Sequence, residues 1–253
     1  MTPEQVQRFA RHLVLKEIGG PGQSALLASK VAIVGAGGLG GPAALYLAAA
    51  GVGSITIIDD DAVDLSNLQR QVQFGEGDIG LAKAEALSNT LKKINSATLL
   101  NPQRQRLSRE NAKHLLGHHS VILDGTDNFD ARFSVNQAAL ALKIPLVSGA
   151  LGRFDAQLSA FRSDHESPCY QCLVPANPPE LETCAEIGVV GALAGIAGSM
   201  MALETIKIIT GAGEPLFGKV WLYDGLKAES RTVRLSRDPG CQACSHHAKI
   251  ATD

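Results

Sequence analysis

The stretch KVAIVGAGGLG, residues 30–40, decides the fold class of this chain. Its first half is a short apolar run with the β-branched composition of a buried strand. The glycines that follow satisfy the pattern GxGxxG through Gly35, Gly37 and Gly40. The next segment, PAALYLAAAG (42–51), is typical of a helix. A strand, a glycine turn and a helix in this order predict a Rossmann-like unit that holds a phosphate against backbone N–H groups at the start of the helix.

Strands and helices continue to alternate on the carboxyl side of this unit. The expected strands are 54–59, part of 97–107, 120–127 and 145–151, and the expected helices are 81–95 and 129–143. This alternation predicts an α/β fold with a mostly parallel, doubly wound sheet and helices on both faces. The nucleotide-binding core then covers about residues 25–150.

The pattern changes in the region 151–250. Strands expected at 157–162, 220–224 and 229–236 enclose a helix from about Val189 to Ile209. We interpret this region as a C-terminal β elaboration for partner binding and metal binding, so that residues 1–253 form a single domain. The run at 188–203 is rich in small residues and shorter than the roughly 18 residues that a membrane span needs, which favours a buried helix.

Composition narrows the class of protein further. Hydrophobic residues make up 45% of the chain, and the formal net charge is −2. This charge predicts neither a nucleic-acid groove nor a surface for anionic membranes. The first 20 residues resemble an amphipathic helix and lack the apolar core of a signal peptide, so we expect a cytoplasmic protein.

The stretch DDDAVDLSNLQRQ (59–71) indicates which nucleotide is bound. Asp59 lies at the end of the second expected strand, where a carboxylate accepts hydrogen bonds from ribose hydroxyls. NAD is the usual ligand of a GxGxxG turn, and ATP is its rival. Asn67, Arg70 and Lys83 favour ATP, because a triphosphate needs hydrogen-bond donors and positive charge. The alternative is that Arg70 and Lys83 form surface ion pairs.

The stretch DGTDNFDAR (124–132) carries the carboxylates expected beside the phosphates. Asp124 ends a strand and Asp127 lies just beyond it, at the carboxyl edge of the sheet. A carboxylate in this place can bind magnesium next to a triphosphate. The alternative is that Asp127 caps the helix that starts near Phe129.

Two CxxC pairs predict a metal centre. Cys169, Cys172, Cys241 and Cys244 supply four thiolates, which suit a closed, tetrahedral, structural zinc site. The alternative is two independent dithiols. Cys184 is left over, in a polar, proline-rich stretch that we expect to cross the site as a mobile loop. Its alternative is an incidental exposed thiol.

Together, GAGGLG, SNLQRQ, GTDN and the two CxxC pairs resemble the HesA/MoeB/ThiF family, which is related to the ubiquitin-activating enzymes. The resemblance runs from RFARH (8–12) to Cys244. It implies ATP- and Mg²⁺-dependent adenylylation of the C-terminal glycine of a small ubiquitin-like sulfur-carrier protein, in thiamin or molybdopterin biosynthesis. The carrier stays open, with a slight lean toward thiamin, and a separate protein would donate the sulfur. Ala192 stands where relatives usually carry proline.

The resemblance also implies roles for individual residues. Gly38 and its neighbours form the backbone cradle, and Asp59 holds the ribose. The other residues expected to contact the nucleotide, its phosphates or its metal are Asp61, Ser66, Asn67, Arg70, Lys83, Asp127 and Asn128, of which Arg70, Lys83 and Asp127 are also expected to take part in the chemistry. Arg11 would reach the site of the other subunit in a homodimer. Cys184 matches a cysteine that takes part in covalent transfer in some members.

Other functions stay open at this stage. An NAD-dependent oxidoreductase would use the same glycine turn. A non-catalytic, zinc-stapled module could bind a ubiquitin-like partner without chemistry. A member of the same family could adenylate a different carboxylate or a modified tRNA base.

Overall fold

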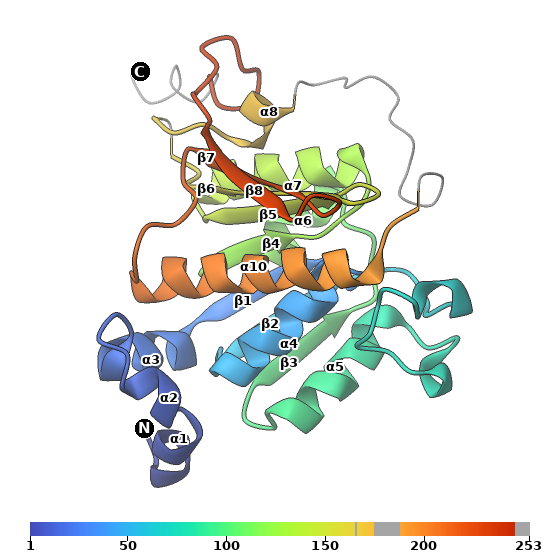
Figure 1. Ribbon diagram of the computed structural model, residues 1–253, viewed down its shortest axis with the longest axis vertical. Helices are drawn as coiled ribbons and strands as arrows, with labels where there is room; N and C mark the ends of the chain where they lie inside the picture. Colours follow the sequence, from blue (N-terminus) through green and yellow to red (C-terminus); the bar gives the residue numbers. More distant parts are fainter. Residues whose placement is uncertain (165, 175–187, 246–253) are drawn as a thin grey trace.

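The computed structural model describes residues 1–164, 166–174 and 188–245 (Figure 1). Within these residues the strands are β1 (Lys30–Val34), β2 (Ser54–Ile58), β3 (Leu99–Gln103), β4 (Val121–Asp124), β5 (Leu146–Leu151), β6 (Asp155–Phe161), β7 (Lys219–Asp224) and β8 (Glu229–Arg234). The helices are α1 (Pro3–Arg8), α2 (Ala10–Leu13), α3 (Gly19–Ala28), α4 (Gly40–Ala50), α5 (Lys83–Ile94), α6 (Arg109–Leu116), α7 (Phe129–Leu142), α8 (Tyr170–Leu173) and α10 (Gly191–Thr210), with 3-10 turns η1 (Leu65–Asn67) and η2 (Glu76–Asp78).

These strands form one sheet in the order β3-β2-β1-β4-β5-β6-β7-β8. The first five in this order are parallel neighbours, and β6, β7 and β8 continue the same sheet in antiparallel fashion. The predicted mostly parallel, doubly wound sheet with a C-terminal β elaboration is therefore confirmed. The strand order reverses between β1 and β4, which is where ligands bind at the carboxyl ends of such sheets.

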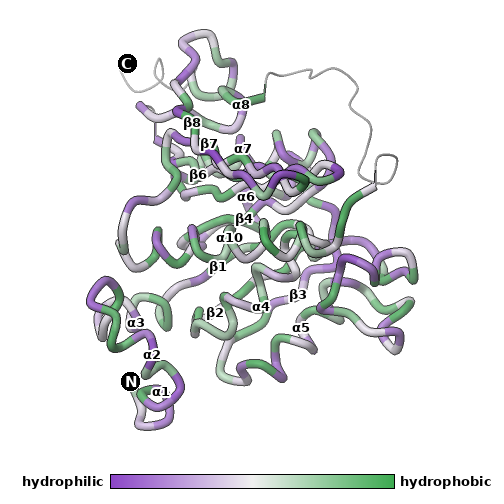
Figure 2. Tube along the Cα trace, in the orientation of Figure 1, coloured by the Kyte–Doolittle hydropathy of each residue, from purple (hydrophilic) through white to green (hydrophobic). Residues whose placement is uncertain are grey.

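Two apolar layers cover the parallel part of the sheet. On β1, Val31 and Ile33 belong to a core shared with α4, α5 and α10, whereas Ala32 and Val34 belong to a core shared with α6 and α7. Successive side chains of a strand point to opposite faces, so one short strand supplies both layers. Figure 2 shows the hydrophobic segments gathered in the sheet and in α4 and α10.

Helix α10 confirms the long helix expected from about Val189 to Ile209. By length and composition alone, with a mean hydropathy of 1.5, it is the one helix in the described chain that could cross a membrane. The sequence argument that this run is too short for a span is therefore wrong. The helix packs against α4, β5 and β6, and it buries Leu193, Ala197 and Met201 in the core, which supports its interpretation as a core helix.

The N-terminus differs from the single amphipathic helix predicted for it, because the chain forms α1, α2 and α3 instead. It turns at Phe9, whose buried ring lies so close to Gly51 that a Cβ there would be 2.5 Å from the ring. His12 Nδ1 lies 2.9 Å from Gln23 Oε1. Gln23 in turn donates to a backbone carbonyl at the end of α4 at 2.9 Å. These contacts hold the N-terminal helices on the body of the domain.

Candidate nucleotide site and metal centre

The glycine turn has the geometry that the motif predicts. Gly35 follows β1 with a φ of 89°, and α4 begins at Gly40. A Cβ on Gly40 would lie 1.8 Å from the carbonyl oxygen of Gly35, so no side chain fits there. The loop after β4 lies directly beside this turn, since the Gly125 N–H donates to Val34 O at 2.9 Å. The two loops meet at the point where the strand order reverses.

Asp59 follows β2 and faces the glycine turn. Its Oδ2 accepts from the backbone N–H of Ala36 at 2.7 Å, and its Oδ1 accepts from that of Asp61 at 2.9 Å. Burial raises the pKa of Asp59, and these two hydrogen bonds lower it in part. Each carboxylate oxygen keeps a lone pair for a further donor, such as a ribose hydroxyl.

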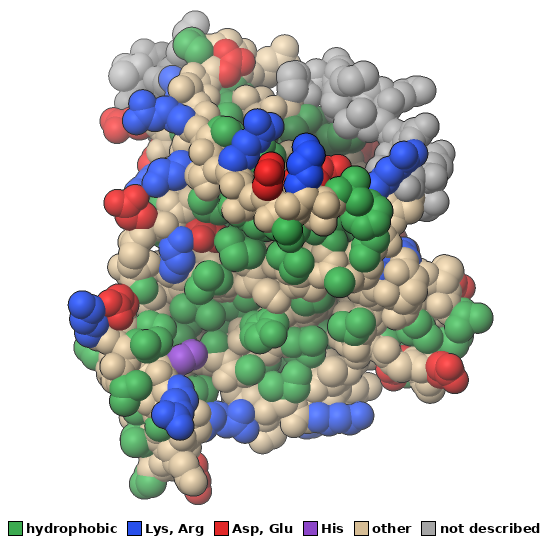
Figure 3. All heavy atoms as spheres, in the orientation of Figure 1, with side chains coloured by type: hydrophobic (Ala, Val, Ile, Leu, Met, Phe, Trp, Pro, Cys, Tyr) green, Lys and Arg blue, Asp and Glu red, His purple; other side chains and the backbone are tan. Residues whose placement is uncertain are grey.

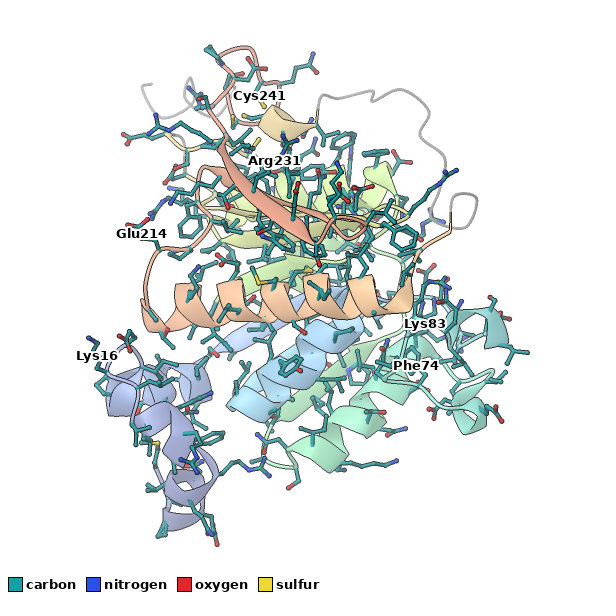
Figure 4. All side chains as sticks on the ribbon, viewed as in Figure 1. Lys16, Phe74, Lys83, Glu214, Arg231 and Cys241 are labelled. Carbon is teal, nitrogen blue, oxygen red and sulfur yellow. The ribbon has the colours of Figure 1, made fainter. Side chains whose placement is uncertain are left out.

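Lys83 opens α5 and is buried, and its side chain points to Asp61. Its Nζ lies 2.8 Å from Asp61 Oδ2, and its backbone N–H donates to Asp61 O at 2.9 Å. The ion pair that was the alternative for Lys83 is therefore present. In this pair the carboxylate of Asp61 is exposed, whereas the side chain of Lys83 is buried. Figure 4 shows Lys83 at the same end of the molecule as the amino end of α10. Asp61 was expected to contact the nucleotide, and Lys83 was expected to contact the phosphates. In the structure these two side chains pair with each other.

Arg70 is free of carboxylates. Its Nη1 donates to the backbone carbonyl of Ser66 at 2.9 Å, and no acidic group of the described chain lies within 4.0 Å of it. The surface ion pair considered for Arg70 is therefore not formed with any residue that the structure describes. Asn67 Oδ1 is buried without a hydrogen-bond partner among the described residues. Arg70 therefore keeps N–H groups for an anionic ligand. The open atom of Asn67 is an acceptor, so a contact with phosphate would have to come from its Nδ2, which lies 3.4 Å from Ser66 Oγ.

The amino end of α10 closes the site from the other side. A Cβ on Gly191 would lie 2.2 Å from Gln69 O, and the position of a Cβ on Gly38 would be 3.3 Å from Ala194. The glycine turn, the segment before Arg70 and the first turn of α10 are therefore packed together. Ala192, the departure from the family pattern, lies within this first helical turn, and the helix forms without a proline there.

Sequence reasoning missed the residue that braces the glycine turn. Gln73 is buried, and its Nε2 donates to Ala36 O at 2.8 Å and to Gly37 O at 3.2 Å. Gln71, also buried, lies beside Gly37. The second and third glutamines of the run LQRQVQ were the available signal, but glutamine alone indicates no particular contact.

The loop after β4 presents Asp127 to solvent. The side chain of Asp127 is exposed, and within the described ranges it has no hydrogen bond or ion pair. Asn128, not Asp127, is the N-cap of α7, and its Oδ1 accepts from the N–H of Ala131 at 2.9 Å. The capping role considered for Asp127 is therefore wrong, and its carboxylate is available to a cation.

A buried polar network, also missed from the sequence, holds this loop. Asp124 accepts from Thr126 through Oδ1, at 3.1 Å from N and 2.7 Å from Oγ1, and from Ser148 Oγ through Oδ2 at 3.0 Å. Arg132 Nη1 lies 3.8 Å from Asp124 Oδ2, and its Nη2 donates to Thr126 O. Asp124 and Arg132 are both buried, so this network fixes the backbone immediately before Asp127.

The four cysteines of the CxxC pairs converge beside α8, as predicted. Their sulfur atoms lie within 4.8 Å of one another, with Sγ–Sγ distances of 3.7 Å for Cys169–Cys241 and 3.6 Å for Cys172–Cys244. A tetrahedron with Zn–S bonds of about 2.3 Å has S–S edges of about 3.8 Å, so the cluster fits zinc closely. The cysteines are free thiols in one cluster, which excludes two independent dithiols.

The charge state of this cluster also points to a cation. Burial raises the pKa of Cys169, and neighbouring thiolates raise it further. Burial also raises the pKa of Cys244 to about 11. Burial alone would raise the pKa of Cys241, but hydrogen bonds from the backbone N–H groups of Cys244 and Ala243 lower it. Four thiolates this close would repel one another, so a positive ion among them would stabilise the cluster. Asn136 supports the cluster from α7, with its Nδ2 3.7 Å from Cys169 Sγ.

Two other predicted residues stand apart from these clusters. Arg11 lies on α2, is exposed, and has no ion-pair partner in the part of the chain that the structure describes. Cys184 lies outside the described residues.

These features define a doubly wound α/β protein with a candidate nucleotide site and a four-cysteine cluster that could hold a metal ion. The ThiF family profile matches residues 9–243, and the chain belongs to the ThiF family. The sulfur carrier protein adenylyltransferase of Thermus thermophilus is 40% identical over 249 residues, which cover 96% of this chain and 92% of that protein. The molybdopterin-synthase adenylyltransferase of Escherichia coli is 39% identical over 244 residues, which cover 96% and 98%.

A longer relative and a solved structure complete the comparison. The probable adenylyltransferase/sulfurtransferase MoeZ of Mycobacterium tuberculosis is 43% identical over 244 residues, and the match covers 94% of this chain and 62% of that protein. The structure of E. coli MccB with ATP superposes with a TM-score of 0.82 at 23% identity, covering 94% of this chain and 74% of that one. At this identity the likeness establishes the fold.

Proposed function

We propose that this protein adenylylates the C-terminal glycine of a small ubiquitin-like sulfur-carrier protein, with ATP as the second substrate. The observation that carries the proposal is the pair of cations beside the glycine turn. Arg70 lies next to Gly38, and Lys83 lies near Asp59, whose carboxylate accepts from the N–H of Ala36 in the turn. The relatives named above, at about 40% identity over nearly the whole chain, carry the name adenylyltransferase. That name supports ATP over NAD.

The chemistry needs no catalytic triad. A C-terminal carboxylate is already ionised at neutral pH, so it can attack the α-phosphate of ATP directly, and pyrophosphate leaves. The difficulty is that two anions must meet, so the barrier is set by positioning and charge. Lys83 and Arg70 offset that charge from this subunit, and Asp59 fixes the ribose. Lys83 reaches the phosphates by exchanging its exposed partner Asp61 for them.

Magnesium fits the carboxylate left free at the start of α7. Asp127 offers oxygen ligands, which magnesium prefers, and no described neighbour occupies them. A bound Mg²⁺ would neutralise phosphate charge during transfer. Asn128 keeps its amide N–H groups for the nucleotide while its oxygen caps the helix. Zinc at the four cysteines would serve as a structural staple with no open position.

We further propose a cytoplasmic homodimer in which Arg11 completes the partner's site. Figure 3 shows hydrophobic side chains gathered over the face of α4 and α10, where Tyr46, Ile196 and Leu203 are exposed. A second copy covering this face would bury them. A separate protein would donate the sulfur, in a thiamin-type or a molybdopterin-type pathway.

The experiment is carrier-dependent exchange of labelled pyrophosphate into ATP, run with purified carriers of the thiamin and molybdopterin types. Each carrier lacking its C-terminal glycine is the matched control. We expect exchange with an intact carrier and none with its truncated form. Carrier binding without exchange would identify a non-catalytic module, and NADH binding without exchange would identify an oxidoreductase. Either result overturns the proposal.

A further inference from the structure

The knuckle formed by the first CxxC pair contains a buried aromatic residue. Tyr170 lies between Cys169 and Cys172 at the start of α8 and is 3% exposed. Its ring packs near Phe133 and Phe161, with centroid distances of 6.1 and 6.2 Å. A metal-bound knuckle fixes its own backbone, so the position of this ring depends on the metal centre.

The same ring contacts the arginine that holds the loop after β4. The guanidinium carbon of Arg132 lies over the Tyr170 ring, 5.9 Å from its centroid. On its other side Arg132 donates to Thr126 O and to Ser148 Oγ, and it faces the buried carboxylate of Asp124. A guanidinium enclosed in this way keeps its orientation only while each neighbour stays in place.

A second connection ties the knuckle to the helix that carries Arg132. Asn136, one turn further along α7, is 1% exposed. Its Oδ1 accepts from the N–H of Tyr170 at 3.0 Å, and its Nδ2 donates to Gln171 Oε1 at 3.3 Å and lies 3.7 Å from Cys169 Sγ. The knuckle is therefore held against α7 by hydrogen bonds to its backbone as well as by the Tyr170 ring.

We propose that Tyr170 is a positioning residue for the loop Gly125–Asn128, acting through Arg132, so that the four-cysteine centre sets the placement of Asp127. The role given to Asp127 in this inference rests on the proposed function. The contact between the knuckle and the loop is independent of that function. Arg132 fixes the carbonyl of Thr126, which is the backbone group directly before Asp127. Without the ring, the guanidinium gains room to turn, and the loop loses one of its fixed points.

The test uses hydrogen–deuterium exchange of the zinc-loaded full chain, read by mass spectrometry over residues 124–131. Tyr170→Leu is expected to raise the exchange rate of this peptide about tenfold, while the exchange rate of β1 stays unchanged. Tyr170→Phe keeps an aromatic ring and is expected to exchange at the wild-type rate. Phe161→Leu is the matched control, because Phe161 touches the same ring but has no cation–π contact with Arg132 in the described chain. Zinc content is measured for each variant. If Tyr170→Leu lacks the native fold, Tyr170→Met takes its place with the same expectations.

A second arm measures pyrophosphate exchange. For a positioning role, Tyr170→Leu lowers kcat about tenfold and leaves the KM for the carrier unchanged, whereas general loss of stability lowers the amount of active protein at constant kcat per folded molecule. Unaltered loop exchange in Tyr170→Leu, or an equal rise in Phe161→Leu, overturns the inference. Absence of pyrophosphate exchange in the wild type overturns the proposed function alone, because the loop measurement does not depend on activity.

Discussion

Asp124 and Asp127 lie three residues apart, and changing each to asparagine is expected to have different effects. One substitution should lower stability, and the other should lower activity. Asp127 is exposed and makes no contact that the described structure would lose, whereas Asp124 is fully buried and faces Arg132. Asp127→Asn therefore tests chemistry, and Asp124→Asn tests the support of the loop. The substitution is the same and nearly isosteric at both positions.

The magnitudes follow from these surroundings. Asp127→Asn removes one charge from the expected metal ligand, so we expect pyrophosphate exchange to fall by roughly 10³-fold or more. Its melting temperature should stay within about 2 °C, as for other surface substitutions. Asp124→Asn leaves the Arg132 charge buried without its partner, which costs about 3 kcal/mol. For a chain of 253 residues this corresponds to a loss of roughly 6–12 °C.

The assays are thermal melts and carrier-dependent pyrophosphate exchange, both run on zinc-loaded protein. Exchange is measured over a magnesium series, because loss of a metal ligand cannot be compensated fully by raising the metal concentration. Full exchange by Asp127→Asn would remove Asp127 from the metal role. A stable Asp124→Asn protein would show that the network around Arg132 carries little of the folding free energy.

Three further predictions concern residues outside this loop. Cys172→Ser should lose zinc and melt at a lower temperature, whereas Cys184→Ser should keep its zinc and the wild-type melting temperature. Elemental analysis and thermal melts measure the two properties. A wild-type protein that melts at the same temperature with and without zinc would contradict the structural zinc site. Mixed Arg11→Ala and Asp127→Asn subunits should regain part of the exchange activity, because one hybrid site is intact; no recovery after verified subunit exchange would place Arg11 in its own subunit's site. Cys184→Ala should keep pyrophosphate exchange, because the nucleophile belongs to the carrier. A thiol-sensitive conjugate at Cys184, mapped by mass spectrometry after addition of carrier, ATP and sulfur donor, would support covalent transfer, whereas full thiocarboxylation by Cys184→Ala would exclude it.

The parts of the site that follow from backbone geometry could be predicted from the sequence. A glycine is required at Gly40 because its Cβ position lies against a carbonyl oxygen, and that requirement is visible as GxGxxG. Asp59 could be placed because the ends of adjacent parallel strands meet at one edge. The cysteines could be placed because two CxxC pairs supply the four thiolates of a closed tetrahedral metal site.

Contacts that depend on three-dimensional packing could not be predicted in the same way. Gln73 reaches back to the glycine turn across more than thirty positions, and nothing in its neighbours indicates this. Helix α6 was missed because it is short and mostly polar, although Ser108 and Asn111 form a capping box at its start. The turn at Phe9 was missed because it depends on Gly51, which belongs to another helix end.

The charges around the glycine turn give an independent reason to expect a polyphosphate. Lys83 is buried but paired with an exposed carboxylate, Asp61, which water can solvate once the lysine leaves. Within the part of the chain that the structure describes, the Arg70 side chain is bonded only to a backbone carbonyl, so it can turn toward an anion without breaking an ion pair there. A diphosphate on the glycine turn would be satisfied largely by backbone N–H groups. Two cations, one bonded among the described residues only to a backbone carbonyl and one paired with an exposed carboxylate, are better matched to a third phosphate and a leaving pyrophosphate than to the nicotinamide half of NAD.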